Sequence, residues 1–407
     1  MNFSHVKILI SSIIPFLIWS PFFPDLIVSL SALIFLVYVI RKKVFYYFNN
    51  KPLIIFFIFC IYCILVSIFV AKDRMLSFES SLFYFRIGVF TCLIWYLIDQ
   101  NKKILTYFYY VLIVCFAVLI VDGYIQSFTS TNIIGLPKSE VRISSFFGDE
   151  LILGSYLSRL FPLLFALFVL KEKKQLELYF VSILFILLSG LIYISGERAA
   201  FFLYVLSYIF IIIFLENFAK LKIILSVLSL ILVLVFTFNF SELKNRMISN
   251  PANTISKSIF TPEHDSLIRT AYNMFLDKPI LGHGPKMFRI ICKDEKYATG
   301  IMPCETHPHN FYVQLLAETG IIGFSFLFSA FAYVLYCAYR QFRSIVLKQK
   351  RYLTDYQVCL LAGILITVWP LTTNGNFFNN WLMVVYSLPV GFYLHSIYGK
   401  NRNNISF

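Results

Sequence analysis

Histidines gather in one stretch of this sequence. Four of the six, His264, His283, His307 and His309, lie within residues 239–320. A neutral imidazole near physiological pH can take a proton from a hydroxyl group. Of the four, His309 stands in the most specific local pattern, a His-Asn pair that is followed at fixed spacing by Gly320 and Gly323. We therefore treat His309 as the candidate general base and His307 as a secondary candidate.

Two arginines provide the complementary chemistry. Arg198 follows Ser195-Gly196-Glu197, and Arg269 stands four residues after Asp265. Guanidinium groups match the geometry of phosphate oxygens and stay protonated. An imidazole and two guanidinium groups would suit the transfer of a group from a phosphate leaving group to a hydroxyl. The alternatives are that Arg198 anchors the chain at a membrane boundary and that Arg269 forms a surface ion pair with Asp265.

The composition indicates what kind of chain must position these residues. Of 407 residues, 59% are apolar or aromatic, 19% are aromatic and 14% are charged. Soluble domains have about 45–50% apolar and about 25% charged residues. This balance excludes a soluble enzyme, a secreted disulfide scaffold and a disordered tail. It predicts an all-α polytopic membrane protein.

Apolar runs long enough to cross about 30 Å of hydrocarbon predict about 12 transmembrane helices. We expect spans at 8–20, 22–40, 53–70, 82–98, 104–121, 149–170, 176–194, 199–215, 221–238, 321–339, 356–373 and 377–395. The predicted organisation is an N-terminal membrane scaffold of about nine helices over 1–238, one large loop domain over 239–320, and C-terminal membrane helices over 321–407.

The distribution of Lys and Arg predicts the orientation of the chain. Basic residues concentrate in alternate connections, such as 41–51 and 340–351, and are sparse in the connections between them. An excess of Lys and Arg marks the cytoplasmic side. Both termini are therefore expected in the cytoplasm and the 239–320 loop outside it. The net charge of +14 then reflects topology, and no nucleic-acid partner is expected.

The 239–320 loop is the only region that reads like soluble protein. We expect a short amphipathic helix over 266–276, a turn at 282–285, and a second helix from near His309-Asn310 to Gly320, capped by Asn310 or Thr306. Cys292 and Cys304 also lie in this loop. In an oxidising compartment they would form a disulfide, and the sequence leaves open whether they do.

Three motifs carry a resemblance to a known family. His309-Asn310 is followed by nine residues and then by Gly320-Ile321-Ile322-Gly323. This pattern resembles the signature of the bacterial O-antigen ligase and O-antigen polymerase family, with every fixed position matched. Ser195-Gly196-Glu197-Arg198-Ala199-Ala200 resembles the family's second mark. Arg269 ahead of Pro279-Ile280-Leu281-Gly282-His283-Gly284 resembles the third. The resemblance covers about residues 195–323.

The resemblance implies a GT-C-like glycosyltransferase of the bacterial inner membrane. Such an enzyme would move O-antigen glycan from undecaprenyl diphosphate to lipid A–core oligosaccharide at the periplasmic face. The reaction would invert the anomeric centre and use no metal or other cofactor. His309 would activate the acceptor hydroxyl, while Arg198 and Arg269 would bind the diphosphate. The 1–238 scaffold would supply a groove for the polyprenyl tail.

Further residues are secondary candidates for the same site: Arg142, Asn310 and Arg159. Arg142 lies in the first outer loop and would add a phosphate contact. Arg159 is expected near the middle of the 149–170 span, where an unpaired charge is costly. A structural pair with Glu150, Asp122 or a polar group of a neighbouring helix is the alternative for Arg159.

The sequence is also compatible with other functions. An O-antigen polymerase and a protein O-glycosyltransferase share these motifs, and a flippase or transporter of lipid-linked sugars would need no bond chemistry. His307 and His309 with His283 or Glu305 would supply enough ligands for zinc, although no His-Glu-x-x-His helix is present. Glu318, about 180° round a helix from His309, is expected to be structural.

Overall fold

The named elements of the protein are all helices. The computed structural model describes residues 3–172, 175–250 and 260–400. The apolar helices are α1 (Phe3–Ser11), α2 (Ile13–Trp19), α3 (Phe22–Lys42), α4 (Lys51–Phe69), α5 (Arg74–Leu82), α6 (Phe85–Gln100), α7 (Lys103–Thr129), α8 (Leu153–Leu170), α9 (Gln175–Ile194), α10 (Arg198–Phe214), α11 (Ala219–Asn239), α16 (Phe311–Val346), α17 (Asp355–Thr367) and α18 (Asn380–Tyr398).

Length and composition confirm a polytopic membrane protein. Within the described residues, eight helical stretches are long and apolar enough to cross a membrane: α3, α4, α5 with α6, α7, α8, α9, α11 and α16. The other four expected spans coincide with the shorter apolar helices Val6–Trp19, Arg198–Phe214, Asp355–Thr367 and Leu382–Tyr398. The count of about twelve crossings stays a prediction.

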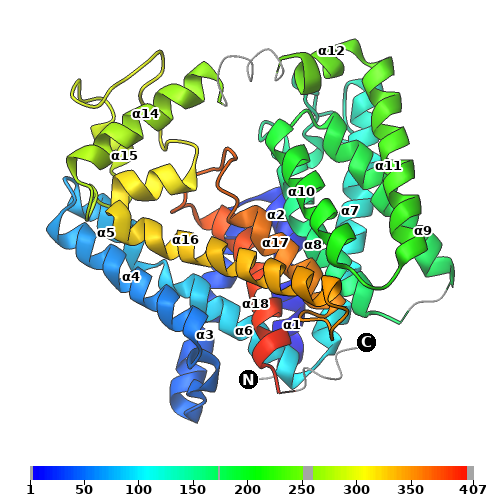
Figure 1. The fold of residues 1–407 in the computed structure, drawn as a ribbon, viewed down its shortest axis with the longest axis horizontal. Coiled ribbons are helices and arrows are strands. Elements are labelled where there is room, and N and C mark those ends of the chain that lie inside the picture. Colours follow the sequence, from blue (N-terminus) through cyan, green and yellow to red (C-terminus); the bar gives the residue numbers. More distant parts are fainter. Residues whose placement is uncertain (1–2, 173–174, 251–259, 401–407) are drawn as a thin grey trace.

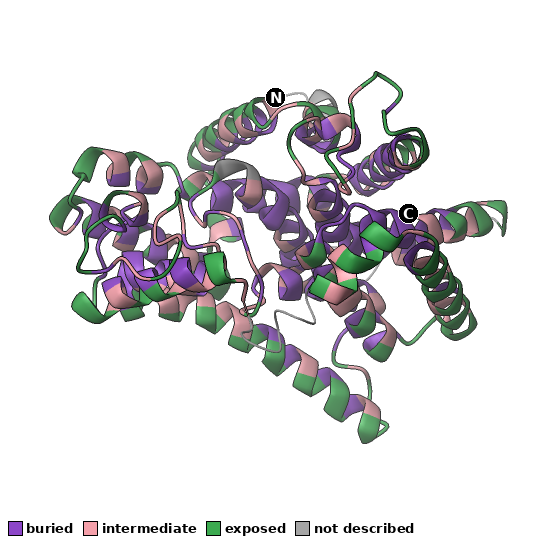
Figure 2. Cartoon of the chain, turned by 90° about the horizontal axis from the view of Figure 1, so that it is seen from above, coloured by how far each residue is buried: buried purple, intermediate pink, exposed green. Residues whose placement is uncertain are grey.

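The burial pattern is that of a helix bundle immersed in lipid. α8 is buried along most of its length, from Leu153 to Phe168, and lies at the centre of the molecule. The peripheral helix α11 instead exposes large apolar side chains such as Ile224, Leu230 and Ile231. Figure 2 shows buried residues concentrated in the central helices and exposed ones on the outermost helices. Such extensive apolar exposure fits a surface covered by membrane.

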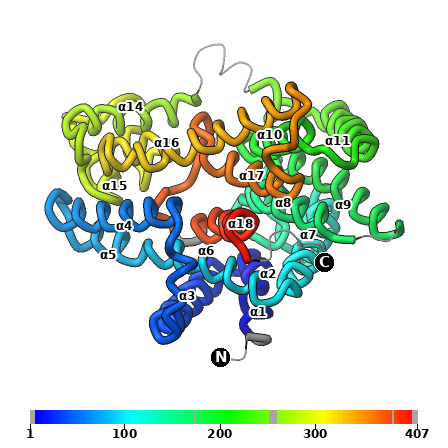
Figure 3. The backbone as a smooth tube through the Cα atoms, turned by 60° about the horizontal axis from the view of Figure 1, so that its bottom comes forward, coloured from blue at the N-terminus to red at the C-terminus, as the bar shows by residue number. Residues whose placement is uncertain are grey.

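A second, smaller core lies in the expected loop region. α14 (Pro262–Asp277) and α15 (Phe288–Ile291) pack around a cluster that includes Leu267, Met274 and Phe288. Cys292 and Cys304 form a disulfide beside it. In Figure 1, α12 (Ser241–Lys244) and α14 lie on the opposite side of the molecule from α1 and the end of α18. Figure 3 again shows α14 on the opposite side from α1. We call the side that carries α14 the α14 face.

The helix expected to end at Gly320 is the first part of a longer element. α16 begins at Phe311, and the Asn310 side chain caps it by accepting from the N–H groups of Tyr312 and Val313. Gly320 has non-helical angles, φ 62° and ψ −168°, and the helix then continues to Val346. The predicted stop is therefore a break within one element.

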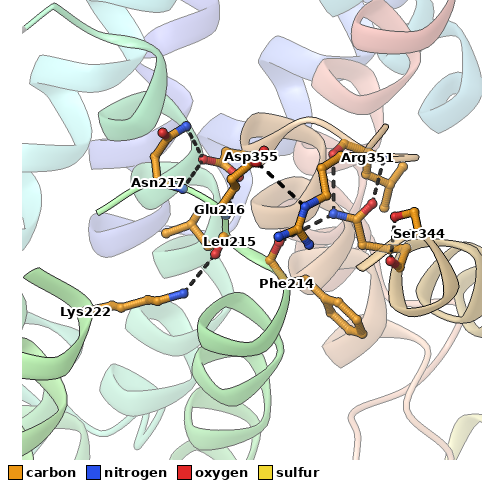
Figure 4. A network of polar contacts seen from close by, with 10 residues as sticks. Phe214, Leu215, Glu216, Asn217, Lys222, Ser344, Arg351 and Asp355 are labelled. Atoms are coloured by element: carbon orange, nitrogen blue, oxygen red, sulfur yellow. Dashed lines mark hydrogen bonds and ion pairs between the residues drawn. The ribbon is translucent and has the colours of Figure 1, made fainter. Parts of the chain in front are cut away.

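The end of α10 opposite Arg198 is tied to α17 by a polar network (Figure 4). The Asp355 carboxylate accepts hydrogen bonds from the backbone N–H groups of Glu216 and Asn217, at 2.8 and 3.0 Å. Lys222 donates to the carbonyl of Leu215. These contacts fix the α10–α11 turn against the start of α17, and so fix the helix that begins at Arg198.

Candidate functional site

Three histidines from two chain segments meet at the α14 face. The ring centroids of His307 and His309 are 4.1 Å apart, and those of His264 and His309 are 5.2 Å apart. His264 lies in the first turn of α14, where Thr261 caps the helix and its hydroxyl contacts His264 Nδ1 at 2.9 Å. The two candidate histidines of the sequence thus lie together, with a third beside them.

The backbone around His309 is held in an uncommon conformation. His309 has φ 55°, and its carbonyl accepts a 2.8 Å hydrogen bond from the N–H of Asn374. The side-chain amide of Asn310 donates to the carbonyls of Pro370 and Thr372. Asn310 therefore both caps α16 and binds the loop before α18. These contacts give Asn310 a positioning role for the neighbouring imidazole.

The Pro-x-x-Gly-x-Gly turn and the break at Gly320 are two halves of one backbone junction. The N–H groups of His283 and Gly284 donate to the carbonyls of Ala317 and Glu318, and that of Ile321 donates to Pro279. A Cβ atom on Gly320 would lie 2.2 Å from the carbonyl oxygen of Ile280. The approach of the two backbones therefore requires glycine at this position. The junction fixes α14 relative to the start of α16.

Arg198 begins α10 next to two other arginines. The guanidinium of Arg246 donates to the carbonyl of Gly196 at 2.8 Å, and that of Arg142 donates to Leu151. A Cβ on Gly196 would lie 3.1 Å from Arg246 Nε and 3.2 Å from Arg142 Cγ, so both side chains pack against this turn. Arg246 lies in a short π-helical segment, Asn245–Ser249. Arg142, Arg198 and Arg246 form what we call the arginine cluster.

The electrostatics of the arginine cluster favour an anion. Burial lowers the pKa of Arg142; the carboxylate of Glu197 acts in the opposite direction, and the charge of Arg198 lowers this pKa again. Burial also lowers the pKa of Arg246, with both other arginines acting in the same direction. The buried carboxylate of Glu197, which also accepts hydrogen bonds from the N–H groups of Gly154 and Ser155 at the start of α8, faces these three arginines and offsets part of their charge. Mutual repulsion among three cations decreases when a phosphate binds between them.

The arginine cluster lies close enough to the histidines to affect the pKa of His264. Burial lowers the pKa of His264 most, and the charge of Arg198 also lowers it. Burial, and then His264, lower the pKa of His309, while Glu305 acts in the opposite direction. Burial brings the pKa of His307 down to about 4. These influences together favour the neutral form of His309, the form that a general base requires.

Arg269 lies apart from this group. Its side chain is 65% exposed, and its guanidinium forms a 2.6 Å ion pair with Asp265, four residues earlier on α14. This is the surface pair that the sequence offered as the alternative. A role of Arg269 in diphosphate binding stays a prediction.

Arg159 has neither of the carboxylate partners that the sequence suggested. Asp122 accepts hydrogen bonds from Ser145 and Asn132 instead, and Glu150 is exposed. Arg159 donates to the side chain of Asn374 at 3.2 Å. Because α8 begins at Leu153 and not at residue 149, Arg159 lies only about 9 Å along the helix, nearer its start than expected.

Glu318 is structural, as expected. It is fully buried, and its carboxylate accepts hydrogen bonds from the backbone N–H of Phe288 and the amide of Gln314.

Among the residues that the structure describes, no group of three or more His, Cys, Asp or Glu side chains is arranged to hold a metal ion.

An apolar cavity of about 590 Å³ opens beside the site. Its lining includes Phe311, which begins α16 two residues after His309, together with Phe377, Tyr386, Lys51 and Tyr398. Its walls come from α4, α6, α16, α17 and α18. A groove supplied by the 1–238 scaffold alone was expected, whereas this cavity lies between N-terminal and C-terminal helices.

Sequence reasoning missed three residues of the site: His264, Arg246 and Asn374. His264 follows the helix start Thr261-Pro262, a local signal that places it in a first turn. Arg246 and Asn374 are far from the motifs in sequence, and only the packing of the helices brings them close. No single-sequence pattern identifies such residues.

The comparison with known families confirms the resemblance. Residues 183–328 match the family model described as O-antigen ligase. The matched range contains Arg198, Arg246, His264, Arg269, His307 and His309. A search of curated proteins returns no match. This part of the chain is similar to the O-antigen ligase family, whose members are membrane proteins with ligase or polymerase activity on glycans.

Proposed function

We propose that the protein is a glycosyltransferase of the bacterial inner membrane that moves O-antigen glycan from undecaprenyl diphosphate to lipid A–core oligosaccharide. His309 is the general base, and Arg198 and Arg269 bind the diphosphate. The reaction takes place at the periplasmic face, and both termini lie in the cytoplasm. The observation that carries this proposal is that the rings of His309 and His264 are in contact, and that Arg198 lies close enough to His264 to affect its pKa, within the matched range.

The proposed reaction is a direct displacement. The acceptor hydroxyl attacks the anomeric carbon while His309 takes its proton, and the bond from that carbon to the diphosphate oxygen breaks. Undecaprenyl diphosphate leaves with the electron pair, and the anomeric configuration inverts. The arginines stabilise the charge that develops on the leaving group, so no general acid is required.

The apolar cavity suits the lipid part of the donor. An isoprenoid chain needs an apolar channel within reach of the reacting carbon, and Phe311, two residues after His309, lines the cavity. Arg142 and Arg246 add cations on the side of Arg198. The partners are thus the lipid-linked donor, the acceptor and the surrounding bilayer.

The direct test uses purified protein in detergent with an undecaprenyl-diphosphate-linked O-antigen donor and a lipid A–core acceptor. We expect product without energy input, and none from His309→Ala. The matched control is His283→Gln, because His283 is held by the carbonyl of Met274 away from the three clustered rings. Unchanged turnover in His309→Ala would remove the base assignment, and absence of product from the wild type would remove the function.

The second candidate is an O-antigen polymerase, which the same family match supports. Its acceptor would be a growing lipid-linked glycan. Deletion of the gene separates the two functions. Loss of all long chains from lipid A–core indicates ligation, whereas a cap of a single repeat unit indicates polymerisation.

A further inference from the structure

Arg159 is a buried cation with an unfilled hydrogen-bonding position. Its side chain lies in the interior, with a residue exposure of 7%. Nη2 donates to Asn374 Oδ1, and Cζ lies 4.6 Å from the centroid of the Tyr386 ring. Nη1 is buried and has no hydrogen-bond partner. Buried guanidinium donors are normally satisfied, so Nη1 is a donor that a bound ligand could use.

The charge of Arg159 is also uncompensated. Within residues 3–172, 175–250 and 260–400, no carboxylate forms an ion pair with it. Arg86 provides the contrast, because it pairs with Asp25 at 2.6 Å and also donates to Ser29. A buried charge without a counter-ion is costly. An anion brought by a ligand would remove that cost.

The position of Arg159 indicates which anion this is. Tyr386, on which the guanidinium lies, lines the apolar cavity. Asn374, its hydrogen-bond acceptor, donates its own N–H to the carbonyl of His309. Arg159 therefore lies between Tyr386, in the wall of the apolar cavity, and the segment of the candidate base. A ligand that contacts both must have an apolar tail and an anionic group at its head.

We propose that Arg159 binds the phosphate nearest the isoprenoid chain of a polyprenyl-phosphate ligand, whose chain occupies the apolar cavity. The inference rests on the proposed function and deepens it by separating the two phosphates of the donor. Nη1 donates to the lipid-proximal phosphate, while the arginine cluster serves the phosphate attached to the sugar. Binding of the proximal phosphate then places the anomeric carbon on the side of His309.

Undecaprenyl monophosphate is the probe, because it carries the proximal phosphate alone. Its binding to full-length protein in phosphatidylcholine nanodiscs is measured for the wild type, Arg159→Gln and Arg159→Lys. One charge-assisted hydrogen bond is worth about 10–100-fold in affinity, and we expect Arg159→Gln to lose that factor. Arg159→Lys should recover part of it. Arg86→Gln, the matched control, should bind as the wild type does.

Two further probes test whether a loss of binding comes from the lost phosphate contact, from a collapsed cavity or from a general preference for anionic lipid. Undecaprenol, which lacks the phosphate, should bind the wild type and Arg159→Gln equally; a parallel loss would mean a collapsed cavity and overturn the inference. An equal loss of phosphatidylglycerol binding would assign the site to bulk phospholipid and overturn it as well. Unchanged binding of undecaprenyl monophosphate in Arg159→Gln also overturns it. If the wild type binds the probe but transfers no glycan, the proposed function fails while the Arg159 site stands.

Discussion

The imidazole ring of His264 lies edge-to-face with that of His309, with 5.2 Å between the ring centroids. The two residues come from the first turn of α14 and from the segment before α16. The junction between the 279–284 turn and the Gly320 break holds these two elements together. Because His264 contributes to lowering the pKa of His309, the contact links the fold of the α14 segment to the protonation of the candidate base.

Replacing His264 should move the pH dependence of transfer. The proposed base acts when unprotonated, so the rate falls as pH drops through the pKa of His309. His264→Gln removes one of the influences that lower this pKa, so the pKa rises and the acid limb moves to higher pH. Burial, the largest cause, remains in place. The measurement is kcat/KM for glycan transfer from pH 4.5 to pH 8.

Glu305→Gln is the matched control, and it should shift the acid limb of the pH profile in the opposite direction. Glu305 raises the pKa of His309 and is exposed, so its neutralisation should move the acid limb to lower pH without disturbing the core. An identical acid limb in the wild type and both variants would show that His309 is not the titrating group.

The stability of the protein should also depend on His307. Its pKa is about 4 in the folded protein and about 6.5 in an unfolded chain. The unfolded state therefore binds more protons between these values, and stability falls as pH drops from about 6.5 to about 4. His307→Asn should flatten this part of the profile. Apparent Tm in detergent, each variant referred to its own value at pH 8, is the measurement; an equally steep profile would contradict the assignment.

Gly320→Ala should disrupt the junction between α14 and α16. The substitution imposes strain at positive φ, about 1–3 kcal/mol, and adds an overlap with the carbonyl of Ile280. We expect a large loss of thermal stability together with loss of transfer. Gly135→Ala is the matched control, because Gly135 also has positive φ, 86°, but no atom within 4 Å of the added Cβ. Equal effects of the two substitutions would show that the close approach is unimportant.

Much of the fold was predictable because lipid imposes simple rules on sequence. A span must be apolar over about 20 residues, and the expected spans coincide with apolar helices. The cap at Asn310 and the break near Gly320 were predictable from residue type, since amide caps and glycine stops are local signals. That α16 resumes after Gly320 was not predictable, because contacts with Pro279 and Ile280 hold the break open.

The site was predictable only where its residues lie in motifs. His309 and Arg198 stand in short patterns, whereas Arg246 reaches the carbonyl of Gly196 across 50 positions. Asn374 contacts both His309 and Arg159 from a loop with no motif of its own. Contacts of this kind depend on the packing of helices, which hydropathy does not determine.

Substitutions of Arg198, Arg246 and Arg269 should have different effects, because the environments of these arginines differ. Arg246 is partly buried and adjoins Arg198, whereas Arg269 is largely exposed and already paired with Asp265. If the arginine cluster binds the diphosphate, Arg198→Gln should lower kcat by about 10²–10³-fold. Arg246→Gln should weaken donor binding by about 10–100-fold. Arg269→Gln tests the role proposed from the motif.

The matched control for Arg269 is Asp265→Asn, which breaks the same ion pair but leaves the cation in place. A surface pair of this kind is worth about 0.3–0.5 kcal/mol, so both substitutions should change stability little. If Arg269 binds diphosphate, Arg269→Gln lowers transfer strongly and Asp265→Asn does not, because the free guanidinium still reaches the donor. Equal, small effects of both would assign Arg269 to the surface pair. Donor KM and kcat measured for the four variants decide between these outcomes.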